Sequence, residues 1–134
     1  CVCVCVCVCE FEYKNVKCIL SKKNLGMGAG NNLGIRNVNK DFALILNPDV
    51  SLENNCVDEI ITASKEIENF AVIAPISSKD KYPNYILEKG HNFDPVKPFK
   101  VKSVDGYAML LNLRRLKKSG KKTGFPDYRK ERQR

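Results

Sequence analysis

Two short segments hold the residues best suited to chemistry. The first is a glycine-rich stretch from Asn24 to Asn32, and the second is the tripeptide Asn47-Pro48-Asp49, which follows an apolar run. Glycine lets a backbone approach a ligand closely. A carboxylate that follows a buried strand lies where α/β sheets bind their ligands, beyond the carboxyl ends of the strands. This order of segments predicts a nucleotide-phosphate site in which Asp49 is the central residue.

Asp49 is a candidate ligand of Mg²⁺ or Mn²⁺. Hard cations take oxygen ligands and are commonly held by one or two carboxylates together with the phosphates of a substrate. Asp49, with the amide of Asn47 beside it, supplies that minimum. Asn-Pro-Asp is also a favourable turn sequence, so a purely structural turn remains the alternative.

The glycine cluster matches no complete phosphate-binding motif. A dinucleotide fingerprint needs a third glycine at position 31, which is Asn31, and no Lys followed by Ser or Thr makes a P-loop. A simple turn is therefore the alternative to a binding loop. Asn31 or Asn32 would then cap a helix that continues through Val38.

Strand and helix patterns alternate around these segments. An amphipathic helix is predicted within residues 52–70, because apolar residues recur there at steps of four and three. These residues are Cys56, Ile60, Ala63, Ile67 and Phe70. Short strands are predicted at 16–20, 42–46 and 71–74, and the continuous apolar run 42–46 is typical of a strand buried on both faces. This order predicts an α/β domain, layered α/β/α, with a largely parallel sheet.

The second half of the chain has a different composition. Residues 76–100 are interrupted by Pro, Gly and Ser and are predicted to form loops or an edge hairpin that covers a site. Residues 101–105 and 107–111 are two predicted extended segments joined at Gly106, and residues 113–118 are a predicted helical turn.

The net charge of +8 lies at one end of the chain. Residues 114–134 contain ten Lys and Arg and two acidic residues, whereas the first 113 residues contain thirteen of each sign and are neutral. The basic charge is therefore a property of the tail, and no basic face is predicted at the candidate site. We expect no nucleic-acid partner, because neither interleaved aromatic residues nor a binding motif accompanies the charge.

Five of the seven cysteines alternate with valine in residues 1–9. We interpret this repeat first as a translated dinucleotide repeat, second as a real strand and third as a metal-thiolate tract, since it lacks the spacing of a zinc site. The two remaining cysteines, Cys18 and Cys56, stand alone. They imply either a reducing compartment or nothing about the compartment. We expect a cytoplasmic protein.

Two motifs carry a resemblance to a known family. They are Asn24-x-Gly26-x-Gly28-x-Gly30-Asn31-Asn32-x-Gly34-Ile35 and, after it, Leu44-Ile45-Leu46-Asn47-Pro48-Asp49-Val50. In this order they resemble the central segment of family 2 glycosyltransferases, notably the rhamnosyltransferase-like branch. Weaker similarity extends the resemblance over residues 16–120.

The resemblance implies a GT-A fold of the nucleotide-diphospho-sugar transferase type. It also implies transfer of a sugar from a nucleotide-diphosphate donor to a saccharide or lipid-linked acceptor, with peripheral association at the inner face of the membrane left open. Asp49 would bind a divalent cation, Mg²⁺ or Mn²⁺, that bridges the donor diphosphate. The donor would be bound by Asn24, Gly26, Gly28, Gly30, Asn31, Asn47 and Asp49, and the acceptor would be bordered by Asp105 and Gly106.

The chain departs from the family pattern at both ends. Where the family has a base-binding strand and an Asp-rich turn, this chain has the Cys-Val repeat. Where the family has an acidic Glu-Asp pair that supplies the catalytic base, this chain offers Phe125-Pro126-Asp127, and we assign no catalytic residue. We therefore expect a fragment made of the repeat (1–10), a partial GT-A domain (11–120) and a basic, disordered tail (121–134).

Two other functions remain open from the sequence. The first is a non-catalytic α/β nucleotide-binding domain, which would bind nucleotide without transferring a sugar. The second, less favoured, is a nucleic-acid-binding module that acts through the basic residues 114–134.

Overall fold

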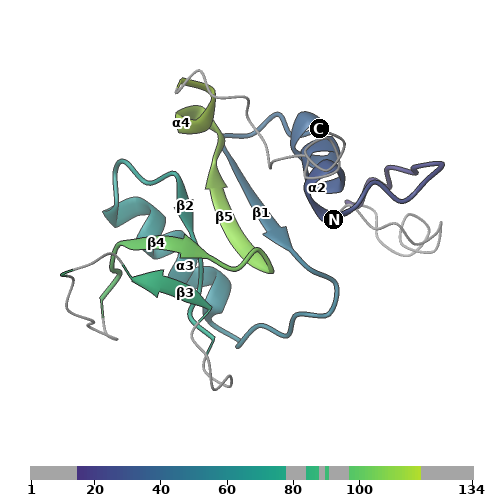
Figure 1. The fold of residues 1–134 in the computed structure, drawn as a ribbon. Helices are drawn as coiled ribbons and strands as arrows, with labels where there is room; N and C mark the ends of the chain where they lie inside the picture. Colours follow the sequence, from purple (N-terminus) through teal and green to yellow (C-terminus); the bar gives the residue numbers. More distant parts are fainter. Residues whose placement is uncertain (1–14, 78–83, 88–89, 91–96, 119–134) are drawn as a thin grey trace, which may run out of the picture. The chain divides into compact units, whose positions relative to one another are not determined.

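A computed structural model describes residues 15–77, 84–87, 90 and 97–118 (Figure 1). The chain divides into two compact units, one formed by residues 1–43 with 112–134 and the other by residues 44–111. The described residues form three helices and five strands. They are α2 (Met27–Arg36), β1 (Phe42–Leu46), α3 (Cys56–Glu66), β2 (Val72–Ile73), β3 (Tyr85–Leu87), β4 (Val101–Val104), β5 (Ala108–Asn112) and α4 (Leu113–Lys118).

The five strands form two small sheets. One has the order β1-β5-β2 and the other pairs β3 with β4. Strand β2 is antiparallel to β5, with Val72 opposite Leu111, and β3 is antiparallel to β4, as the opposed arrows of Figure 1 show. Strand β1 is also antiparallel to β5, because the Asn47 N–H donates to the Tyr107 carbonyl at 2.8 Å and the Leu113 N–H donates to the Asp41 carbonyl at 2.8 Å.

The predicted α/β class is confirmed, but the prediction of a largely parallel sheet is wrong for the pairings described. Strands β1 and β2 run in the same direction, as a strand-helix-strand unit requires. Strand β5 lies between them and is antiparallel to both. The later strand therefore separates two strands that the sequence pattern predicts as parallel neighbours.

The strand at 42–46 is confirmed, but its predicted burial on both faces is wrong. Its burial alternates, and Leu44 and Leu46 remain 38% and 37% exposed. The strand that is buried on both faces is β5, in which Ala108, Met109, Leu110 and Leu111 are all buried. The difference follows from position, because β1 lies at the end of the strand order and β5 lies in the middle.

The core of the unit formed by residues 44–111 is a cluster of Ile60, Phe70 and Leu110. It joins α3, the segment after α3, and β5, and the half-buried Cys56, Ile67 and Ile73 pack against it. Four of the five residues predicted to form the apolar face of the helix are in this group. The amphipathic helix and the strand after it are therefore confirmed.

In the other unit, two sequence predictions are wrong. Residues 16–20 form no strand, and the helix predicted to follow Asn31 or Asn32 begins earlier, at Met27. The predicted turn of glycines is thus mostly helix. The reason is that the first turns of a helix can include glycine at a cost of only about 1 kcal/mol per residue relative to alanine.

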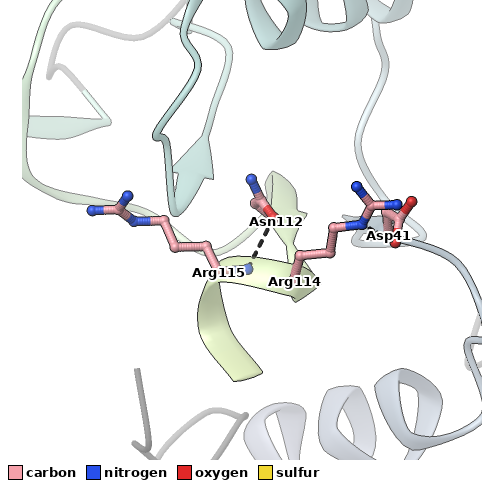
Figure 2. A network of polar contacts seen from close by, with 4 residues as sticks. All are labelled: Asp41, Asn112, Arg114 and Arg115. Carbon is pink, nitrogen blue, oxygen red and sulfur yellow. Dashed lines mark hydrogen bonds and ion pairs between the residues drawn. The ribbon is translucent and has the colours of Figure 1, made fainter. Parts of the chain in front are cut away.

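The short helix α4 is anchored to the residue that precedes β1 (Figure 2). Leu113 is only 1% exposed, and the Arg114 guanidinium contacts the Asp41 carboxylate at 2.5 Å. The side-chain oxygen of Asn112 accepts a hydrogen bond from the Arg115 N–H at 3.1 Å. Both partners of the ion pair are largely exposed, so the pair contributes at most about 1 kcal/mol. No helix in the described ranges is long and apolar enough to cross a bilayer.

The core cluster predicts a difference between two neighbouring isoleucines of α3. Ile60 is 5% exposed and Ile61 is 42% exposed. We expect Ile60→Ala to lower the free energy of unfolding by about 2 to 4 kcal/mol, because it removes buried methyl groups and leaves a cavity. Ile61→Ala is the matched control and should cost less than about 1 kcal/mol. Denaturant unfolding measures both, and equal losses would contradict the assigned core.

Candidate functional site

The tripeptide Asn47-Pro48-Asp49 forms a turn directly after β1. The Val50 N–H donates to the Asn47 carbonyl at 3.3 Å, which closes a four-residue turn with proline at its second position. The Asn47 N–H is bonded to the Tyr107 carbonyl, so the start of the turn is fixed to the chain just before β5. Proline ends the ladder of β1 because it has no N–H to donate. The turn and the candidate site are therefore the same feature.

This turn lines a cavity of about 360 Å³ within the unit formed by residues 44–111. The cavity lies at the carboxyl ends of β1 and β2 and beside the amino end of α3. Its polar lining comes from the turn, from the loop that leads into α3, from the segment after β2 and from the residue before β5. These polar residues are Asn47, Asp49, Ser51, Glu53, Ser77 and Tyr107.

The charges around the cavity are negative. Asp49 and Glu53 both line it, and none of the lining residues that the structure describes is basic. Cys56, at the start of α3, lines it as well. Burial, and then the negative charges of Glu59 and Glu53, raise the pKa of the Cys56 thiol above its ordinary value. The thiol is therefore neutral near pH 7 and is poorly suited to act as a nucleophile.

The donor set suits a hard cation that also binds a phosphate. Asp49 and Glu53 are carboxylates, and Ser51 and Asn47 add neutral oxygens to the same lining. Mg²⁺ and Mn²⁺ take such oxygens and fill their remaining positions from water and substrate phosphates. The described residues contain no cluster of three or more His, Cys, Asp or Glu that would hold a metal by itself.

The wall opposite the turn is formed by Pro75, Ile76 and Ser77, and a buried side chain holds it. Asn84 is only 4% exposed. Its side-chain oxygen accepts a hydrogen bond from the Ser77 N–H at 2.9 Å, and its Nδ2 donates to the Pro75 carbonyl at 2.9 Å. Sequence analysis missed Asn84, because an isolated asparagine in a loop-rich region gives no signal of this role.

The predicted donor-binding residues of the glycine segment lie in the other unit. Gly26 has a φ of 74° and precedes the first residue of α2, while its N–H donates to the side-chain oxygen of Asn24 at 2.8 Å. Gly28 and Gly30 lie within α2, and a Cβ at Gly30 would have no atom within 4 Å. The positive φ at position 26 therefore favours glycine there, whereas packing does not require glycine at position 30.

Asn31 has an unusual environment in α2. Its side-chain Nδ2 is buried and has no hydrogen-bond partner among the described residues. A buried polar group that lacks a partner costs about 1 to 3 kcal/mol, so such groups often have a role outside the fold. The donor-binding role predicted for Asn31 stays a prediction, as it does for Asn24, Gly26, Gly28 and Gly30.

The predicted acceptor residues lie next to the cavity lining in the sequence, and the two unusual terminal segments lie outside the described residues. Asp105 and Gly106, the predicted acceptor side, are not among the cavity-lining residues, although the next residue, Tyr107, is. Their acceptor role stays a prediction. The Cys-Val repeat in residues 1–10 and the segment Phe125-Pro126-Asp127 lie outside the described residues.

Substituting alanine for Gly26 and for Gly30 should have opposite effects on stability. Gly30→Ala should raise the free energy of unfolding by about 0.5 to 1 kcal/mol, because alanine favours a helix and its Cβ meets open space. Gly26→Ala is the matched comparison and should lower it by about 1 kcal/mol or more, because a Cβ is disfavoured at positive φ. Thermal or denaturant unfolding measures both, and a loss of stability in Gly30→Ala would contradict the helical position.

The cause of the Cys56 pKa shift can be tested chemically. Removing the charge of Glu53 or Glu59 should lower the pKa of the Cys56 thiol and so speed its alkylation at a fixed pH. The rate would be followed by mass spectrometry of the peptide that contains Cys56, in Glu53→Gln and Glu59→Gln variants. Asp58→Asn is the control, because Asp58 does not contribute to this shift. Unchanged rates in both Glu variants would show that burial alone raises the pKa.

Comparison with known proteins gives one match. The family model described as glycosyl transferase family 2 matches residues 4–127, which is most of the chain. Neither a curated protein nor a solved structure matches the chain significantly. The match includes both the glycine segment and the turn at Asp49.

Proposed function

Because the chain belongs to glycosyl transferase family 2, we propose that it binds a nucleotide-diphosphate sugar and transfers the sugar to a hydroxyl group of an acceptor. The observation that carries this proposal is the turn after β1. It brings Asp49 into a cavity that is also lined by Glu53 and by three hydroxyl-bearing residues, Ser51, Ser77 and Tyr107. The cavity lies at the carboxyl ends of β1 and β2, where α/β sheets bind their ligands.

The charges of the cavity support a donor that arrives with a divalent cation. A diphosphate alone would be repelled by the carboxylates of Asp49 and Glu53, since like charges at short distance are unfavourable. When bound, Mg²⁺ or Mn²⁺ offsets the charge that develops on the leaving diphosphate. Asp49 would hold the cation, and Asn47 would contact the donor near its ribose or phosphate.

The reaction exchanges one bond at the anomeric carbon for another. A bond forms between that carbon and the acceptor oxygen, the bond from the carbon to the diphosphate oxygen breaks, and the acceptor proton passes to a base. The residues of this chain contribute binding and orientation of the donor, which can supply a large part of a barrier reduction. We assign no residue to the base.

The glycine segment supplies further donor contacts in this proposal. Gly26 has a positive φ directly before the first residue of α2, and the buried Nδ2 of Asn31 lacks a hydrogen-bond partner among the described residues. Backbone N–H groups at a helix amino end attract phosphates. Asn24, Gly28 and Gly30 would line the same part of the donor site. A rhamnosyl donor is the first to test, because the motifs resemble that branch.

The acceptor is proposed to be a saccharide or a lipid-linked molecule that enters beside Asp105 and Gly106. These residues immediately precede Tyr107, which lines the cavity. A lipid-linked acceptor would bring the protein to a membrane surface, where basic side chains of residues 114–134 are attracted to anionic lipids.

The role of Asp49 predicts a metal-dependent difference in nucleotide affinity. Uridine, guanosine and thymidine diphosphates would be titrated by calorimetry with Mn²⁺ present and then with a chelator. Asp49→Asn should weaken binding of the preferred nucleotide in Mn²⁺ by about tenfold or more, because the cation loses its protein carboxylate. In chelator the two proteins should bind equally weakly.

Asp58→Asn is the matched control for this experiment. Asp58 is an exposed carboxylate of α3 that does not line the cavity, so its variant should bind as the native protein does. Equal affinities of native protein and Asp49→Asn in Mn²⁺ would overturn the metal role of Asp49. Nucleotide binding without release of sugar from any nucleotide sugar would instead favour a non-catalytic nucleotide-binding domain.

A further inference from the structure

We propose that Asn84 is a positioning residue for the nucleotide-sugar cavity, and this inference rests on the proposed function. Asn84 precedes β3 and is 4% exposed, which makes it the buried polar residue of the described core. Asparagine is mostly found at the surface unless hydrogen bonds satisfy its amide. The bonds that satisfy Asn84 all lead to segments that shape the cavity.

The side chain of Asn84 binds two backbone groups that lie earlier in the chain. It accepts from the Ser77 N–H and donates to the Pro75 carbonyl, seven and nine residues earlier. Pro75, Ile76 and Ser77 line the cavity on the side of β2. Two hydrogen bonds to one planar amide constrain both the position and the direction of this short wall.

The backbone of Asn84 reaches a second part of the cavity. Its carbonyl accepts from the Asp105 N–H at 2.8 Å, at the end of the β3–β4 pair. Two residues later, Tyr107 lines the cavity, and its carbonyl accepts from the Asn47 N–H. Asn84 is therefore linked through short segments to the wall at 75–77 and to the start of the turn that carries Asp49.

The chemistry of the contact requires an amide. A carboxylate of the same size could accept from Ser77 but could not donate to the Pro75 carbonyl, and an apolar side chain could do neither. Loss of either bond removes a contact that holds a half-buried segment of backbone, which allows the wall to shift. A shift of a cavity wall weakens the binding of a ligand that was placed by it.

The experiment compares Asn84→Leu and Asn84→Asp with Asn112→Leu. Asn112 also accepts a backbone N–H, from Arg115, but it lies in the other unit and does not line the cavity. Affinity for the preferred nucleoside diphosphate with Mn²⁺ would be measured together with the free energy of unfolding. Amide hydrogen exchange at Ser77 would report on its hydrogen bond to the Asn84 side chain. Exchange at Asp105 would report on its hydrogen bond to the Asn84 backbone carbonyl.

We expect Asn84→Leu to speed exchange at Ser77 and to weaken nucleotide binding by about tenfold, while Asp105 stays protected by the backbone carbonyl. Asn112→Leu should change affinity less than about twofold, even where it lowers stability similarly. Should Asn84→Leu fail to fold, Asn84→Asp decides the question, because it keeps the volume and loses the donor. If the folded Asn84 variants bind the nucleotide as tightly as the native protein does, this inference is overturned and the proposed function is unaffected. Absence of nucleotide binding by the native protein would overturn the proposed function and this inference with it.

Discussion

The structure of residues 44–111 depends on the packing of Ile60 and Phe70 against Leu110. These side chains come from α3, from the segment after it and from β5, so their contact fixes the helix against the sheet. Burial of each contributes about 1.5 to 3 kcal/mol relative to exposure. The loop between β1 and α3 is held at both ends by this packing and by the bond from Asn47 to Tyr107. The position of Asp49 thus depends on apolar contacts outside the turn together with one backbone hydrogen bond at the first residue of the turn.

The sequence predicted those helices and strands whose position is determined by a single local pattern. The spacing of Cys56, Ile60 and Ile67 identified α3 and its buried face, because helix period and burial coincide there. Local sequence patterns did not predict the features that depend on contacts between segments far apart in the chain. The burial of β1 and the direction of its neighbour depend on β5, and no local pattern shows that a later strand lies between β1 and β2. The glycine segment is mostly helix and not a turn, because the low helix propensity of glycine costs only about 1 kcal/mol per residue and does not prevent a helix.

The same division applies to the candidate site. Asn47 and Asp49 could be identified because a proline and two polar residues interrupt an apolar run, and the turn and binding interpretations proved compatible. Glu53, Ser77 and Tyr107 join them in the cavity through folding alone, and nothing in their local sequence indicates that they meet. Asn84 is the extreme case, since its significance lies wholly in two hydrogen bonds to backbone atoms seven and nine residues away. The family could be identified without knowledge of these contacts, because both motifs are present in the sequence in the expected order.

The central place of β5 has a consequence for how the chain folds during synthesis. Strand β5 is the last strand of its sheet to be made, yet it supplies the hydrogen-bonded neighbour of both β1 and β2. Until residues 108–112 leave the ribosome, the backbone N–H and C=O groups along the edges of the two earlier strands lack that neighbour. Contacts of such long sequence separation form slowly and leave unpaired strand edges open to other chains. The β1-β5-β2 sheet can therefore form only after residues 108–112 have been synthesised.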